Sequence, residues 1–179
     1  MIELSLHILD LIENSINAEA DEISISLEIN EEDNLLILSI EDNGKGFDVD
    51  LDELFDTFYT TKTFRVIGLG LSSAKSAAEN AGGEMQIGKS ENLGGAKVTL
   101  TFQISHEGRV PMGDLGSAIA GVSLTNPNVN IIVKIVQNKQ VKLLHNTVEY
   151  YEKFPEKNEL EIFKIIEQEI NNLIKGLGI

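Results

Sequence analysis

Apolar and polar residues alternate strictly in the stretch EISISLEI, which runs from Glu22 to Ile29. Side chains of a β-strand point alternately to its two faces, so this pattern predicts a half-buried strand with its apolar residues on one face. A turn over residues 30–34 and a second strand over residues 35–41 (LLILSIE) follow. Two such strands in succession predict a sheet with one buried face, and helices elsewhere in the sequence have to cover it.

The segment LHILDLIENSINA predicts a helix in front of these strands. Asp10, Glu13, Asn14 and Asn17 fall at positions i, i+3, i+4 and i+7, so their side chains line one stripe of the helix. Apolar residues flank this stripe on both edges, with Leu4, Ile8 and Leu11 on one edge and Leu6, Leu9, Ile12 and Ile16 on the other. One interpretation is an ordinary amphipathic surface helix. The other is a pocket wall, on which carboxylate and amide oxygens could hold a hard cation such as Mg²⁺.

Two glycines stand close together in the turn EDNGKGF, directly after the second strand. Gly44 and Gly46 indicate backbone that takes positive φ or closely approaches a ligand, and Asp42 brings a carboxylate to the same point. Asp-Asn-Gly is also typical of a plain hairpin turn. Further on, GLGL at residues 68–71 opens a predicted helix over residues 72–81, whose free N–H groups and positive dipole end would face an anion.

Three more segments complete the first part of the chain. EMQIGKS and AKVTLTFQI predict a strand pair joined by a loop that contains Gly94 and Gly95, and DVDLDELF predicts a short helix. Phe55, at the end of that segment, and Phe58 are predicted core anchors. Together these elements predict an α/β fold, an α+β two-layer sandwich in which helices pack on one face of a mixed sheet.

The sequence changes character after Ser105, where a connector with glycine and proline begins. GSAIAGVSL then predicts a short helix, and VNIIVKIV and QVKLLH predict a hairpin about Asn138 and Lys139. A last helix is predicted to end near Lys175. Its apolar residues at helical spacing are Leu160, Phe163, Ile166, Ile170 and Leu173. We predict that this helix belongs to the core, with a partner-binding face as the alternative.

The charge balance argues against several classes of function. The 179 residues include 29 acidic and 14 basic side chains, a formal net charge of −15 at pH 7, so nucleic-acid and anionic-membrane partners are not expected. The absence of cysteine excludes disulfides, thiolate catalysis and cysteine-ligated metals. Because the sequence shows neither an apolar run of transmembrane length nor a signal peptide, we expect a cytoplasmic location.

Four motifs, in this order, resemble those of the histidine-kinase-like ATPase family, also called the GHKL or Bergerat-fold ATPases. DLIENSINA resembles its N box, DNGKGF the first glycine box, LFDTFYTTK the aromatic box and GLGL the second glycine box. The family includes sensor kinases, anti-sigma serine kinases, gyrase and mismatch-repair ATPases. The resemblance implies an ATPase domain over residues 1–105 and leaves residues 106–179 as an α/β extension, which we expect to be regulatory or partner-binding.

The resemblance also implies roles for individual residues. Asn14 would bind Mg²⁺, and Asp42 would accept a hydrogen bond from the exocyclic amine of adenine. Asp10 occupies the position of the general base, which is a glutamate in gyrase-type ATPases and anti-sigma kinases. The other residues implied in nucleotide binding are Asn17, Gly44, Gly46 and Phe47, then Lys62 and Arg65 towards the phosphates, and Gly68, Leu69, Gly70 and Leu71 in the lid loop.

The implied cofactors are ATP and Mg²⁺, and the implied activity is ATP-dependent phosphoryl transfer to a partner protein in bacterial signalling. A response regulator or an anti-sigma antagonist would be such a partner, and the resemblance is compatible with a homodimer. The alternatives are a non-catalytic nucleotide-controlled binding module and a simple ATPase. His7 is predicted at a pocket edge or partly buried, because sensor kinases carry their phosphoacceptor histidine in a separate helical hairpin.

Overall fold

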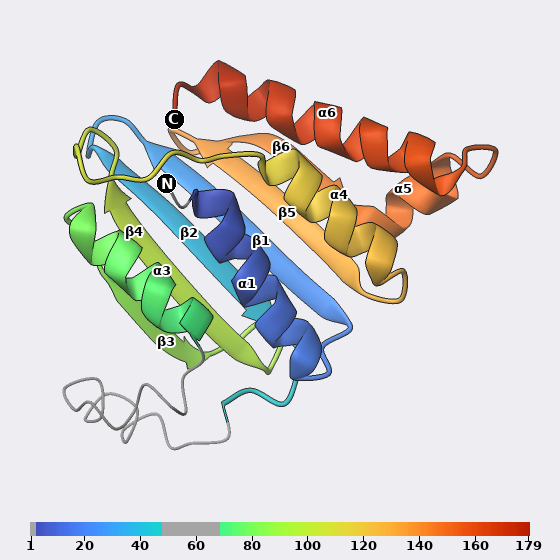
Figure 1. The fold of residues 1–179 in the computed structure, drawn as a ribbon, viewed down its shortest axis with the longest axis horizontal. Coiled ribbons are helices and arrows are strands. Elements are labelled where there is room, and N and C mark those ends of the chain that lie inside the picture. The colour runs from blue at the N-terminus through green and yellow to red at the C-terminus, as the bar shows by residue number, and fades with distance from the viewer. Residues whose placement is uncertain (1–2, 48–68) are drawn as a thin grey trace.

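The computed structural model describes residues 3–47 and 69–179, and its centre is a six-stranded sheet in the order β3-β4-β2-β1-β5-β6. The strands are β1 (Glu22–Asn30), β2 (Leu35–Asp42), β3 (Met85–Lys89), β4 (Ala96–Gln103), β5 (Asn130–Gln137) and β6 (Gln140–Asn146). The helices are α1 (Leu4–Asn17), α3 (Leu69–Asn80), α4 (Leu115–Thr125), α5 (Thr147–Lys153) and α6 (Glu159–Leu177). Figure 1 shows α1, α3, α4 and α6 on one face of the sheet, which confirms the predicted α/β class.

The alternation in β1 builds the centre of the core. Every second residue of β1, from Ile23 to Ile29, is buried, while the residues between them are partly exposed. Strand β2 pairs antiparallel with β1 and repeats this pattern. Helix α1 covers the buried face between α3 and α4 (Figure 1). Each aliphatic side chain buried in this way stabilises the fold by about 2 kcal/mol.

Strand β1 is paired on both of its sides. Its second neighbour is β5, which runs parallel to it, with Glu22 opposite Asn130 and Ile29 opposite Gln137. The sheet therefore continues without interruption from the region before Ser105 into the region after it. The division of the chain into two units at this residue stays a prediction.

The hairpin predicted after α4 is confirmed. Strands β5 and β6 pair antiparallel, and Asn138 and Lys139 between them have φ values of 49° and 67°. Positive φ at both central residues is typical of the tight turn whose twist matches that of the flanking strands.

The predicted apolar face of the last helix is wrong in part. Ile166 and Ile170 are buried as expected, but Leu160 is exposed, and Phe163 and Leu173 are half-buried. The buried stripe of α6 consists of Ile162, Ile166, Ile170, Ile174 and Leu177. Helix α6 packs against α4, and this neighbour selects one of two apolar stripes that the sequence offers. The helix also continues past Lys175 and ends before Gly178, whose φ is 71°.

Helix α1 differs from its prediction on one edge. Leu6 is 48% exposed, because it lies one turn before Asp10 and so shares the polar stripe. His7 is fully buried, not partly buried. The predicted short helix of DVDLDELF, together with Phe55 and Phe58, lies outside the described residues.

Helix α3 begins at Leu69, before the predicted start at residue 72. Among the described helices, none is long and apolar enough to cross a membrane.

Candidate functional site

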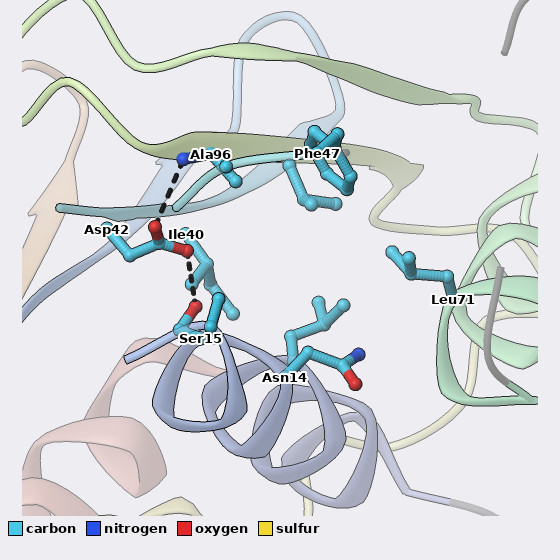
Figure 2. A pocket seen from close by; sticks show the side chains of 11 residues that line it. Asn14, Ser15, Ile40, Asp42, Phe47, Leu71 and Ala96 are labelled. Atoms are coloured by element: carbon cyan, nitrogen blue, oxygen red, sulfur yellow. Dashed lines mark hydrogen bonds between the residues drawn. The ribbon is translucent and has the colours of Figure 1, made fainter. Parts of the chain in front are cut away.

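A cavity of about 190 Å³ opens between α1, the start of α3 and the ends of β2 and β4. Its polar lining residues are Asn14, Ser15 and Asp42. Its other lining residues are Leu11, Ala18, Ile40, Gly46, Phe47, Leu71, Ala96 and Val98. We call it the Asp42 cavity. Figure 2 shows Asp42 and Ala96 on the strand side, facing Ser15 and Asn14 on the helix.

The carboxylate of Asp42 is buried, with 4% of the residue exposed, and is held by three hydrogen bonds. Its Oδ2 accepts from the Ser15 hydroxyl at 2.6 Å, and its Oδ1 accepts from the backbone N–H groups of Gly44 and Ala96, each at 3.0 Å. An ionised carboxylate offers about four acceptor positions. One position, on Oδ2, therefore remains for a further donor beside the cavity.

Three glycines make the close packing around this carboxylate and in the turn after it possible. A Cβ on Gly95 would lie 2.4 Å from Asp42 Oδ1 and 2.5 Å from the Asp42 carbonyl oxygen, which accepts from the Gly95 N–H. A Cβ on Gly44 would lie 2.7 Å from the Ala18 carbonyl oxygen. Gly46 has a φ of 75°, a conformation that other residues rarely take.

The glycine-containing turn is tied to the junction of α1 and β1. The Asn43 side-chain oxygen accepts from the backbone N–H groups of Asp21 and Glu22, each at 3.0 Å. The Lys45 N–H donates to the Ala18 carbonyl at 2.9 Å. Because β1 and β4 already occupy both sides of β2, this turn is not a plain hairpin turn of that strand.

The polar stripe of α1 is exposed, and only one of its four members lies at the predicted pocket. Asn14 lines the Asp42 cavity, whereas Asn17 and Glu13 do not. Asp10 lies beside the first turn of α3, where a Cβ on Gly70 would be 3.0 Å from the Asp10 Cβ and 3.4 Å from its Oδ2.

On the other side of α1, burial lowers the pKa of His7, and the nearby negative charge of Asp10 opposes that shift. His7 is therefore a core residue, and its side chain does not line the Asp42 cavity.

The structure brings together several of the residues that the sequence singled out. Asn14, Asp42, Gly46, Phe47 and Leu71 all line the Asp42 cavity. Gly44 donates to Asp42, Leu69 is the first residue of α3, and Gly70 lies beside Asp10. Lys62, Arg65 and Gly68 lie outside the described residues.

Sequence reasoning missed the contacts that Ser15, Gly95 and the backbone N–H of Ala96 make with Asp42. One signal could have revealed Ser15, since it is a hydroxyl residue on the apolar side of an amphipathic helix, where a buried polar group needs a hydrogen-bond partner. Gly95 and Ala96 gave no such signal, because their contacts join segments far apart in the sequence.

Comparison with known proteins gives a family match and matches to individual proteins. The family described as "Histidine kinase-, DNA gyrase B-, and HSP90-like ATPase" matches residues 2–106. The sensor histidine kinase WalK of Bacillus subtilis (strain 168) is 30% identical over 95 residues, which are 50% of this chain and 15% of WalK. The chain therefore spans only a small part of that relative's length.

A solved structure resembles the fold at low sequence identity. The N-terminal domain of a DNA repair protein has a TM-score of 0.53 at 15% identity, over 80% of this chain and 52% of that one. The Aquifex aeolicus MutL ATPase domain complexed with ADP has a TM-score of 0.46 at 15% identity, over 94% and 70% of the two chains. The family match covers more than half of the sequence, and the protein thus belongs to the histidine kinase-, DNA gyrase B- and HSP90-like ATPases.

Proposed function

We propose that the protein binds ATP in the Asp42 cavity and that Asp42 selects adenine. The observation that carries the proposal is the unused acceptor position on the buried Oδ2 of Asp42, whose other positions are taken by Ser15, Gly44 and Ala96. The exocyclic amine of adenine can donate to that position. Guanine presents a carbonyl there and would leave the carboxylate unpaired and in repulsion with it.

The rest of the lining fits a planar base. Leu11, Ile40 and Val98 are buried apolar side chains, and Phe47 and Leu71 border the cavity in Figure 2. Binding sites for cofactors are typically apolar, with a few polar groups that fix the orientation of the ligand. In this cavity Asp42 is the polar group that fixes the base.

The residues on the helix side fit a magnesium-bound phosphate chain. Asn14 offers a side-chain oxygen at the cavity, and oxygen is the ligand atom that Mg²⁺ prefers. When bound, Mg²⁺ neutralises charge on the transferred phosphoryl group. By their resemblance to the family motifs, Lys62, Arg65 and the loop around Gly68 would bind the phosphates.

We further propose that Asp10 acts as the general base in phosphoryl transfer to a partner protein in signalling. Its exposed carboxylate lies one helical turn before Asn14 and beside Gly70, at the start of α3. From there it would take the proton of an attacking hydroxyl. A non-catalytic, nucleotide-controlled binding module is the second candidate, because aspartate is one methylene shorter than the glutamate of related bases and so has less reach.

Titration calorimetry tests the binding proposal. ATP and ADP should bind in the presence of Mg²⁺, GTP should not bind, and Asp42→Ala should abolish the preference for adenine. Asn14→Ala should weaken only the Mg²⁺-dependent part of ATP binding. Asp33→Ala, on the exposed turn between β1 and β2, is the matched control and should bind as the wild type does. Equal affinity of the wild type for ATP and GTP would contradict the adenine assignment.

Incubation with ATP labelled on its terminal phosphate separates the two candidates. In the presence of co-purified partner proteins, the wild type should transfer label to a partner, and Asp10→Asn should lose transfer while its ATP affinity changes little. If tightly bound ATP yields neither labelled protein nor free phosphate, the binding module is the correct function.

A further inference from the structure

The stretch between Asp114 and Glu149 contains no acidic residue, although the chain as a whole carries a net charge of −15. Its only charged side chains at neutral pH are Lys134, Lys139 and Lys142, all in the hairpin of β5 and β6. The hairpin therefore carries three lysines and no acidic residue of its own, on a strongly acidic protein.

Strand β6 forms one edge of the sheet, three strands away from β2 and the Asp42 cavity (Figure 1). One of its sides pairs with β5, and within residues 3–47 and 69–179 no strand pairs with the other side. An edge strand presents a row of backbone N–H and C=O groups that can pair with an added strand.

Two apolar side chains of this edge are accessible. Val141 is 57% exposed and Leu144 is 68% exposed, and both lie on β6. The opposite edge is different, because β3 is a shorter strand, contains Gly88 and buries its Ile87. Proteins usually protect a free edge by shortening it or by a β-bulge. Strand β6 is longer than β3, and the irregularity in its pairing with β5 lies opposite Ile135 and Val136, so the regularly paired part from Leu143 to Asn146 is the length of edge that an added strand can use.

Two lysines border these apolar side chains. Lys134 lies opposite Leu144 in the register of β5 and β6, and Lys142 follows Val141. Neither forms a salt bridge with a carboxylate in the part of the chain that the structure describes, and Lys142 donates only to the side-chain oxygen of Gln140, at 3.2 Å. Lys139 lies differently, since it lines a surface hollow together with acidic residues of the turn after β1.

We infer that β6 is a docking edge for an extended, acidic segment of a partner protein, which adds to the sheet beside β6. The backbone of β6 would supply the pairing groups, Val141 and Leu144 would contact apolar side chains of the segment, and Lys134 and Lys142 would pair with its carboxylates. A second copy of this chain fits less well, because two positively charged hairpins would then face each other. The inference does not depend on nucleotide binding.

Fluorescence anisotropy with short labelled peptides tests the docking edge. A peptide that alternates valine and glutamate should bind, one that alternates valine and lysine should not, and added salt should weaken the binding. Leu144→Glu and Lys142→Glu should each weaken it by about tenfold. The matched controls lie on α6, where Leu160→Glu and Lys164→Glu also change exposed residues and should leave binding unchanged. Hydrogen exchange should show new protection of backbone amides in residues 140–146.

Three results would overturn the inference. The first is equal binding of the acidic and basic peptides, and the second is protection that appears away from β6. The third is self-association of the wild type in sedimentation experiments that Leu144→Glu abolishes, since a second copy would then occupy the edge. Lys142→Glu keeps the test decisive if Leu144→Glu lowers stability, because Lys142 is exposed and makes no buried contact.

Discussion

Two strands of this sheet carry a buried titratable side chain at or near their ends, and the two surroundings differ. Asp42 ends β2 and accepts hydrogen bonds from Ser15, Gly44 and Ala96. His145, near the end of β6, is 1% exposed, and neither of its ring nitrogens has a hydrogen-bond partner among the described residues.

The surroundings of His145 are aromatic on one side and include one carboxylate. The ring of Tyr150 lies 4.1 Å from it, between centroids, and the Glu169 carboxylate lies 3.4 Å from its Nδ1. Burial lowers the pKa of His145 to about 4 and raises the pKa of Glu169. The imidazole is therefore kept neutral, whereas the Asp42 carboxylate is surrounded by donors that suit an ion. Burial of a polar group alone does not indicate a binding site. Several donors that converge on a buried carboxylate, with one acceptor position of that carboxylate still unused, do indicate one.

Removing residues 106–179 is the most severe test of whether residues 1–105 can fold and bind ATP without them. Strand β1 would lose its parallel neighbour β5, and the side of α1 that packs against α4 would be exposed to water. We expect aggregation, or a melting temperature lowered well below that of the full chain, in differential scanning fluorimetry. A truncated protein that is soluble, equally stable and fully able to bind ATP would show that the extension is an independent module.

Gly95→Ala should damage the Asp42 region in particular. The new Cβ would meet the Asp42 backbone oxygen at 2.5 Å and its Oδ1 at 2.4 Å, so the structure must shift, at a cost of about 3 kcal/mol. We expect ATP binding to be lost in calorimetry and the free energy of unfolding in urea to fall. Gly88→Ala is the matched control, because a Cβ there meets no atom within 4 Å. If both variants behave alike, the packing around Asp42 is less tight than described.

Lowering the pH should reduce the stability of the fold through His145. Its folded-state pKa of about 4 lies below the ordinary value of 6.5, so the unfolded chain binds more protons in that window and stability falls with falling pH. From pH 7 to pH 5 the loss should be about 2 kcal/mol. His145→Leu should remove this part of the pH dependence of unfolding in urea, while His106→Gln should keep it.

Two other groups also titrate in this range. His7 contributes with the same sign as His145, and Glu169, with its raised pKa, contributes with the opposite sign. The measurement therefore compares how steeply the free energy of unfolding changes with pH in the wild type and in His145→Leu, in which His7 is unchanged and Glu169 keeps its carboxylate. Equal slopes would show that the histidine is not buried in solution.

Ser15→Ala should have the smallest effect of these changes, and it tests the hydrogen bonds that Asp42 accepts. It removes one of the three donors to Asp42, and a hydrogen bond to a charged group contributes about 2 kcal/mol or less. Calorimetry should show ATP affinity reduced several-fold with the preference over GTP retained, because Oδ2 still accepts from adenine. Ser26→Ala, on the polar face of β1, should change nothing. Complete loss of the preference would mean that Ser15 itself contacts the base.

Features that depend on residues close together in the sequence could be predicted from the sequence alone. The alternation from Ile23 to Ile29 predicted the buried face of β1, and Asn138 and Lys139 predicted the tight turn between β5 and β6. Each of these depends on backbone geometry within a few residues.

Other features depend on partners far along the chain and could not be predicted in the same way. The role of Ser15 requires Asp42, which lies 27 residues away. The parallel pairing of β1 with β5 leaves no trace in periodicity, and on α6 the choice of Ile162 over Phe163 depends on where α4 lies. Local patterns thus specified the elements, and tertiary contacts decided which of their faces are used.

The parallel pairing of β1 with β5 also has a consequence for synthesis of the chain. Translation runs from the N-terminus, and β5 is made about a hundred residues after β1 (130 − 22 = 108). Until β5 has left the ribosome, one edge of β1 in the nascent chain stays without its neighbour, and contacts of such large sequence separation form slowly. Completion of the sheet is thus a late step. Strand β1, which lies beside the strand that carries Asp42, is fully paired only after β5, in the last third of the sequence, has been made.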